Sequence, residues 1–155
     1  MGQALGDPAG TLDDETWRGI ELERESLGRY LARNVRGGEL VVSSEDDADF
    51  TPVELLLVAL AGCGAVNVDE LTSRRAEPTV FRAAAEGHKV RDEGGGRLTD
   101  LRVTFTVSFP DGPDGDRARE FLPRALQQTH DRICTVSRTV ELGEPVRYET
   151  ETVSA

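Results

Sequence analysis

The fold is decided by residues 51–63, TPVELLLVALAGC. Thr51 stands where a helix N-cap is expected, Pro52 takes the first helical position, and Glu54 follows three residues after the cap. This capping box predicts a helix from Leu55 to about residue 75. The first half of that helix is apolar on every side, which is typical of a buried helix. We therefore expect sheet to cover one side of it and a second subunit to cover another.

Strands are predicted on both sides of this helix. Upstream, the turn signal Arg36-Gly37-Gly38 within residues 20–44 favours a β-hairpin or meander. Downstream, residues 79–87 and 98–109 are predicted strands, joined by a flexible loop over residues 91–96. The second of these strands alternates apolar and polar residues cleanly. An antiparallel sheet with one face buried produces this pattern.

The remainder of the chain completes an α+β fold class without a βαβ repeat. A second helix is predicted over residues 116–133, where Pro123 should kink or break it. A short helical piece over residues 134–140 and a last strand over residues 145–149 follow. Residues 1–18 are expected to form a flexible acidic tail, and residues 19–155 a single domain.

Composition excludes several classes of partner. The chain has 155 residues, and its 18 Lys and Arg are outnumbered by 29 Asp and Glu, for a net charge of −11. This balance argues against binding to nucleic acid or to anionic membrane. The longest apolar stretch, residues 55–66, is shorter than the ~20 residues of a membrane span. Because the first twenty residues lack a secretory h-region, we expect a cytoplasmic protein.

The two cysteines, Cys63 and Cys134, are the candidate reactive groups. A structural disulfide is not expected among reduced cytosolic thiols, and the spacing of Cys and His residues does not match a zinc site. A redox pair and two unrelated core cysteines both remain possible. Cys63 is either a small buried hydrophobe or a reactive thiol given space by Gly62 and Gly64, with an arginine lowering its pKa.

His130 precedes Cys134 by about one helical turn, which raises a further alternative. A Cys–His nucleophile pair would place the chain among cysteine hydrolases. Such an enzyme also needs an orienting group and an oxyanion hole, and the sequence shows neither. A solvated or capping role for His130 is therefore favoured.

Three segments together resemble the OsmC/Ohr family. Residues 51–63 resemble the helix that begins with a proline and ends at the family's reactive cysteine. Residues 133–140, ICTVSRTV, resemble the motif of its second cysteine. Residues 30–37 resemble its arginine-bearing N-terminal sheet. The order and spacing hold over residues ~20–150, nearly the whole chain.

The resemblance implies antiparallel sheets around a long buried central helix, in an intertwined homodimer. It further implies a thiol-dependent peroxidase that reduces organic hydroperoxides in oxidative-stress defence. Cys63 would attack the peroxide, Cys134 would resolve the resulting sulfenic acid as a disulfide, and an external dithiol would reset the pair without a cofactor or metal. Arg33 would hold the Cys63 thiolate, with Arg36 as the second choice.

One departure from the family pattern concerns the acid that Ohr-type enzymes place ten residues before the reactive cysteine. Here that position is Val53, and Glu54 is assigned to the capping box instead. The departure keeps two other hypotheses open. One is a non-catalytic OsmC-like dimer that binds an apolar small molecule in the cleft between subunits. The other, ranked lowest, is a redox sensor or structural protein.

Overall fold

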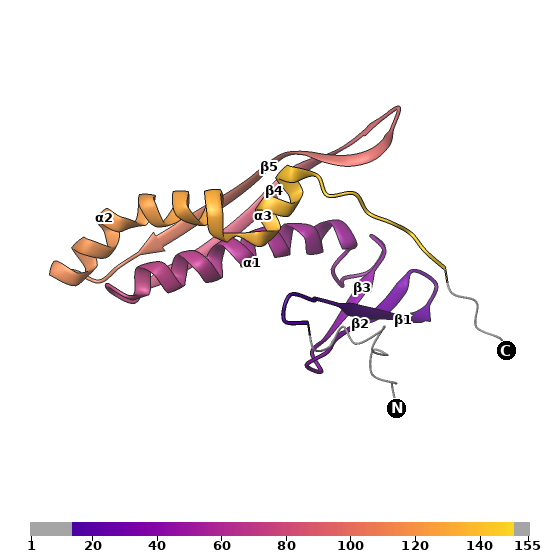
Figure 1. The fold of residues 1–155 in the computed structure, drawn as a ribbon, viewed down its shortest axis with the longest axis horizontal. Coiled ribbons are helices and arrows are strands. Elements are labelled where there is room, and N and C mark those ends of the chain that lie inside the picture. The colour runs from indigo at the N-terminus through magenta and orange to yellow at the C-terminus, as the bar shows by residue number, and fades with distance from the viewer. Residues whose placement is uncertain (1–13, 151–155) are drawn as a thin grey trace. The chain divides into compact units, whose positions relative to one another are not determined.

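The computed structural model describes residues 14–150. Most of the predicted tail, residues 1–13, therefore lies outside the described residues. The chain divides at Leu56/Leu57 into two compact units, which are described one at a time. Figure 1 shows the order of the elements along the chain.

The first unit holds a three-stranded antiparallel meander, β1 (Ile20–Ser26), β2 (Arg29–Asn34) and β3 (Glu39–Ser43), paired in that order. The predicted turn lies between β2 and β3. There the Asn34 side-chain oxygen accepts hydrogen bonds from the backbone N–H groups of Arg36 (2.9 Å) and Gly38 (3.0 Å). Gly37 has φ of 84°, a conformation that glycine adopts without steric cost. These contacts confirm the meander.

Helix α1 (Pro52–Ser73) begins where the capping box predicts. The Thr51 N–H and hydroxyl donate to Glu54 Oε2 at 2.8 and 2.9 Å, and the Glu54 N–H donates back to Thr51 Oγ1 at 3.2 Å. The backbone hydrogen bond from Thr51 lowers the pKa of Glu54, and the hydroxyl adds to this effect. The structural role assigned to Glu54 is therefore confirmed.

One face of α1 is buried within the chain, and the rest is not. The buried stripe contains Leu60, Gly64 and Val68, whereas Val58 is 49% and Val66 69% exposed. The expected burial on all sides is therefore not reached by a single chain. By length and mean hydropathy (1.5), α1 as a whole is also long and apolar enough to cross a membrane, whereas the sequence-based estimate counted only its apolar run, residues 55–66.

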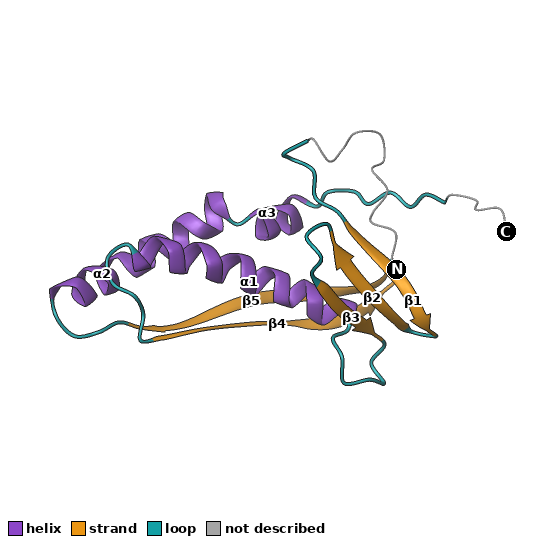
Figure 2. Cartoon of the chain, turned by 90° about the horizontal axis from the view of Figure 1, so that it is seen from below, coloured by secondary structure: helices purple, strands orange, loops and turns teal. Residues whose placement is uncertain are grey.

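The second unit contains a long antiparallel hairpin of β4 (Val80–Asp92) and β5 (Gly95–Ser108). Both strands were predicted, but they continue through residues that were expected to form a loop. The reason lies at the turn, where the Asp92 carboxylate accepts from the Gly94 N–H (2.9 Å) and from Arg97 Nε (2.8 Å). Figure 2 shows α1, α2 and α3 along one side of this hairpin.

Two helices follow, α2 (Pro113–Gln128) and α3 (Thr135–Leu142), separated by the π-helical turn η2 (Thr129–Ile133). The predicted short helix after Cys134 is confirmed as α3. Of the two outcomes predicted at Pro123, a kink or a break, the break does not occur, because α2 continues beyond it to Gln128. Ala118 and Ala125, both fully buried, anchor the helix on either side of Pro123.

The predicted last strand was also wrong. Residues 145–149 have no regular secondary structure and no ladder partner among the described residues. Val146 is 78% and Tyr148 95% exposed. The apolar pattern of this segment is present in the sequence. A strand forms only where its N–H and C=O groups can bond to a neighbouring strand, however.

Candidate functional site

The second unit brings the two cysteine side chains together. Cys63 lies in the middle of α1, and Cys134 lies at the N-cap of α3. Their thiols lie close enough to affect each other's pKa, and both are free rather than joined as a disulfide. Two candidate residues that stand 71 positions apart in the sequence, 63 and 134, are thus neighbours in the structure.

Both sulfurs lie against the first turn of α3. Cys134 Sγ accepts a hydrogen bond from the Ser137 N–H at 3.4 Å. The Ser137 side chain and the Val136 N–H also lower the pKa of Cys134, and the N–H groups of Val136 and Thr135 lower that of Cys63. Unpaired N–H groups at a helix N-terminus carry partial positive charge, which favours an anion such as a thiolate.

The two thiols differ in acidity. Burial raises the pKa of Cys63, and the neighbouring Cys134 adds to the rise, against the effect of the α3 amides. Burial also raises the pKa of Cys134, but the effects of Ser137, Cys63 and Val136 outweigh it and bring that pKa below the ordinary thiol value. The two thiols therefore titrate as an interacting pair.

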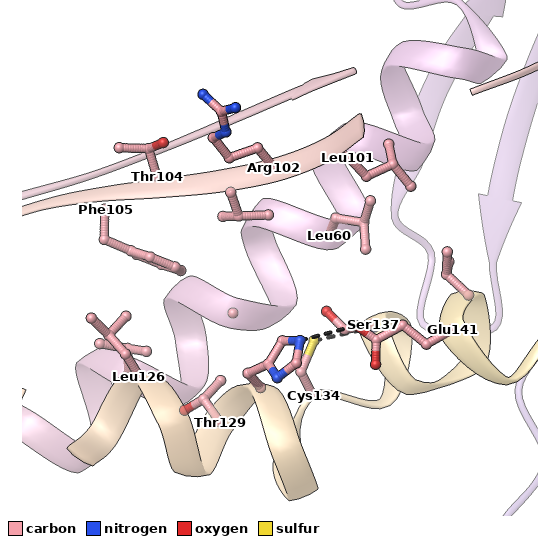
Figure 3. A pocket seen from close by; sticks show the side chains of 15 residues that line it. Leu60, Leu101, Arg102, Thr104, Phe105, Leu126, Thr129, Cys134, Ser137 and Glu141 are labelled. Carbon is pink, nitrogen blue, oxygen red and sulfur yellow. Dashed lines mark hydrogen bonds and ion pairs between the residues drawn. The ribbon is translucent and has the colours of Figure 1, made fainter. Parts of the chain in front are cut away.

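A cavity of about 530 Å³ adjoins the pair. Its walls are mainly apolar and come from α1, β5, α2 and α3. Those shown in Figure 3 include Leu60, Leu101, Phe105 and Leu126. Cys134 belongs to the lining, and so does Thr129, whose Oγ1 is buried without a hydrogen-bond partner among the described residues. The cavity therefore combines an apolar volume, a sulfur and an unsatisfied hydroxyl.

His130 also lines this cavity but makes its polar contacts elsewhere. Its ring nitrogens contact Asp131 Oδ1 and Glu141 Oε1, both at 2.9 Å. The hydrogen bond to Asp131, followed by that to Glu141, raises the pKa of His130. Both ring nitrogens of this exposed residue are thus engaged by carboxylates, which fits the favoured solvated or capping role rather than that of a base for Cys134.

The predicted arginine lies in the first unit. Arg33 Nη1 contacts Glu23 Oε2 at 2.6 Å, and Arg33 Nε contacts Glu39 Oε1 at 2.9 Å. The hydrogen bond to Glu23, then that to Glu39, raises the pKa of Arg33. Its role toward Cys63 stays a prediction, and so does that of Arg36.

The glycines beside Cys63 serve different purposes. A Cβ on Gly64 would lie 2.9 Å from the Phe105 ring tip, whereas a Cβ on Gly62 would meet nothing within 4 Å. Gly64 therefore permits close packing of α1 on β5. Space around a reactive thiol was one of the two interpretations of these glycines, and for Gly64 packing is the reason that the structure supports.

Sequence reasoning missed Ser137 and Thr129. Ser137 could have been found, because a residue at the N-cap accepts from the N–H three positions later, and Cys134 and Ser137 have that spacing. Thr129 gave no signal, since its position depends on the π-helical turn. Among residues 14–150 there is no cluster of three or more His, Cys, Asp or Glu that could hold a metal.

Comparison with known proteins places this site in a family. The model of the OsmC-like protein family matches residues 44–149, which include both cysteines. An uncharacterized protein of Mycobacterium tuberculosis is 30% identical over 135 residues, covering 86% of this chain and 96% of that protein.

Solved structures share the fold at lower identity. A hypothetical protein from Aquifex aeolicus has a TM-score of 0.65 at 20% identity, covering 82% of this chain and 89% of its own. An OsmC-like protein of unknown function from Vibrio cholerae has a TM-score of 0.63 at 15% identity, with coverage of 81% and 94%. The organic hydroperoxide resistance protein OhrB of Bacillus subtilis has a TM-score of 0.50 at 13% identity, with coverage of 79% and 90%. With its α+β architecture and its family-model match, this chain belongs to the OsmC-like protein family.

Proposed function

We propose that this protein is a thiol-dependent peroxidase that reduces organic hydroperoxides through the Cys63/Cys134 pair, in defence against oxidative stress. The observation that carries the proposal is the closeness of the two thiols, which affect each other's pKa beside an apolar cavity. A sulfenic acid formed on one sulfur has the other within reach, so a disulfide can form without a large movement.

The cavity supports the choice of substrate class. Its walls are mostly aliphatic and aromatic, which suits the carbon chain of an organic hydroperoxide better than hydrogen peroxide. An external dithiol would return the disulfide to two thiols, and the chemistry requires no resident cofactor. Family membership supports the general reaction, and the organic hydroperoxide resistance protein of Bacillus subtilis shares the fold.

A homodimer in the cytoplasm is part of the proposal. The exposed apolar side chains of α1, among them Val58 and Val66, are unusual for a helix in contact with water over its length. A second copy packed on this helix would remove them from water. Sedimentation of the purified protein at two concentrations tests the dimer, and a monomer at both would contradict it.

The test of the reaction is a thiol count after one equivalent of cumene hydroperoxide, on freshly reduced protein. We expect loss of both thiols, loss of two hydrogens in the intact mass, and a peptide with Cys63 linked to Cys134. Two thiols still free would refute the dithiol mechanism. The thiol count needs no turnover by an external dithiol, so its result does not depend on which reductant the protein uses.

A second candidate function has a specific observation in its favour. Val53 stands where the arginine-orienting acid is expected, and the cavity could hold an apolar molecule without any reaction. The protein would then be a non-catalytic dimer that binds a small apolar ligand. In that case Cys63→Ser leaves ligand binding intact, and mass spectrometry of the native protein would detect the bound molecule.

A further inference from the structure

Asn67 is a half-buried polar residue in the second half of helix α1. It lies four positions after Cys63, so the two side chains are neighbours on one face of the helix. Asparagine is a poor helix former in the interior of a helix. Helix propensity therefore does not account for its place one turn after the cysteine.

The side-chain amide of Asn67 is held against Cys63 at two points. Asn67 Nδ2 donates to the Cys63 carbonyl oxygen at 2.7 Å, and it lies 3.8 Å from Cys63 Sγ, within hydrogen-bond reach of a sulfur. An amide nitrogen carries two hydrogens, so one bonds to the carbonyl while the other is free to meet the sulfur. The short bond fixes the amide, and the long contact places it beside the thiol.

The surroundings of Cys63 make such a donor useful. Burial raises the pKa of Cys63, and the neighbouring Cys134 adds to the rise. The reactive form of a thiol is its thiolate, so a cysteine that attacks a peroxide needs donors that favour the charge. A hydrogen bond to a charged acceptor is shorter and stronger than one to a neutral acceptor. The 3.8 Å contact is therefore expected to tighten when Cys63 ionises.

Resting on the proposed peroxidase function, we propose that Asn67 is a positioning residue for Cys63: its amide holds the sulfur in place and donates a hydrogen bond to the thiolate that attacks the hydroperoxide. The proposal stands on the two contacts from Asn67 Nδ2 to the same cysteine. A donor that is already fixed in place needs no reorganisation when the charge develops.

The attack balances with this donor beside the sulfur. Cys63 first gives its proton to solvent. The thiolate then attacks the outer oxygen of ROOH, the S–O bond forms, the O–O bond breaks, and the alkoxide takes a proton from solvent to leave as ROH. Cys63 becomes a sulfenic acid, and two electrons pass from its sulfur to the peroxide. Asn67 exchanges no proton and acts through the sulfur.

The decisive experiment titrates Cys63 without any peroxide. In the Cys134→Ser background Cys63 is the single thiol of the chain, and its rate of alkylation by iodoacetamide against pH gives its pKa. Serine is a good N-cap residue, so this background should keep the start of α3. Asn67→Ala removes the donor, and Asn67→Asp replaces it with a carboxylate of the same shape. The control, Ser73→Ala, removes a hydroxyl of the same helix that donates to Asp69 Oδ1 at 2.9 Å.

The variants should differ in a defined order. We expect Asn67→Ala to raise the pKa of Cys63 by about half to one unit. Asn67→Asp should raise it further, because a second negative charge faces the thiolate, and Ser73→Ala should leave it unchanged. An unchanged or lowered pKa in Asn67→Ala, a smaller rise in Asn67→Asp, or an equal rise in Ser73→Ala would overturn the proposal. Alanine is the best helix former, so loss of the helix would not explain a rise, and circular dichroism checks the fold of each variant.

The peroxide reaction separates positioning from a structural effect. With both cysteines present and one equivalent of cumene hydroperoxide, we expect Asn67→Ala to lose its thiols about 3- to 10-fold more slowly than native protein at neutral pH. The two rates should converge as pH rises above the pKa of Cys63. Slowing by the same factor at every pH would indicate a structural displacement and would contradict the proposal. If native protein keeps both thiols free, the peroxidase itself is refuted, while the alkylation series still decides whether Asn67 supports the charge on Cys63.

Discussion

Two glycines in α1 allow the packing of the helix on the hairpin to be measured. Gly62 and Gly64 lie two positions apart, and both flank Cys63. Gly64 is buried against Phe105, whereas Gly62 is exposed and has open space where a Cβ would stand. The same substitution, glycine to alanine, therefore adds one methyl group to a packed contact in one variant and to open space in the other.

The expected size of the difference follows from the contact distance. Either substitution gains about 1 kcal/mol of helix propensity. At position 64 the new Cβ would lie 2.9 Å from Phe105 Cζ, where carbon atoms in contact prefer about 3.5–4.0 Å. Overpacking of this kind costs about 1–3 kcal/mol. Because the propensity gain cancels between the variants, Gly62→Ala should be more stable than Gly64→Ala by about 1–3 kcal/mol.

Urea denaturation followed by circular dichroism measures both free energies of unfolding. In thermal unfolding, each kcal/mol should separate the midpoints by about 2–4 °C for a chain of this size. Two protein concentrations are used, so that any contribution from subunit association is seen as a concentration-dependent midpoint. Equal stability of the two variants would refute the packing role of Gly64. A more stable Gly64→Ala would do so as well.

Three further predictions concern the cap, the histidine and the arginine. Thr51→Ala should lower the free energy of unfolding by about 0.5–2 kcal/mol. Because the pKa of Glu54 is lowered in the folded protein, the contribution of its carboxylate to stability is present above the ordinary pKa and is lost as pH falls through the lowered value. Thr51→Ala should therefore weaken the loss of stability at acid pH, measured as the urea midpoint against pH. An unchanged loss at acid pH would contradict the capping box. The pKa of His130 is raised, first by Asp131 and then by Glu141. The contribution of its charged ring to stability should therefore be fully present below the ordinary pKa and lost as pH rises through the raised one. Native protein and His130→Gln should converge in free energy of unfolding toward alkaline pH, and a difference in that free energy that stays constant with pH would count against this. Arg33→Ala should slow peroxide-driven oxidation of the thiols about 100-fold with little change in stability. The control is Arg29→Ala, which removes a guanidinium from ion pairs with Glu25, Asp47 and Asp49 and should leave the oxidation rate unchanged. Equal rates for both variants would remove Arg33 from the mechanism.

Local signals in the sequence predicted the elements that local physics controls. The capping box fixes the start of α1, and the alternation of β5 fixes its inward face, because each depends on residues within a few positions. The last strand failed for the opposite reason. Its apolar pattern was present, but strand formation needs a partner elsewhere, and residues 145–149 have none among the described residues.

The approach of Cys63 to Cys134 was implied by family resemblance and could not be derived from spacing. It depends on how α2 ends. A proline was expected to kink or break that helix, yet the break comes at η2, where the Cys134 N–H donates to the Thr129 carbonyl at 2.8 Å across five residues. Sequence carries no simple rule for the position of such a π-helical turn.

This turn also decides which backbone groups face the two sulfurs. A regular continuation of α2 would have paired the N–H groups of residues 135–137 with carbonyls one turn earlier. Because the helix ends and restarts at Cys134, those N–H groups are released. The Ser137 N–H donates to Cys134 Sγ at 3.4 Å, and the N–H groups of Thr135 and Val136 lower the pKa of Cys63, which reaches the same turn from α1. The shared surroundings of the two thiols thus follow from where one helix ends, which a motif match to the two cysteines does not contain.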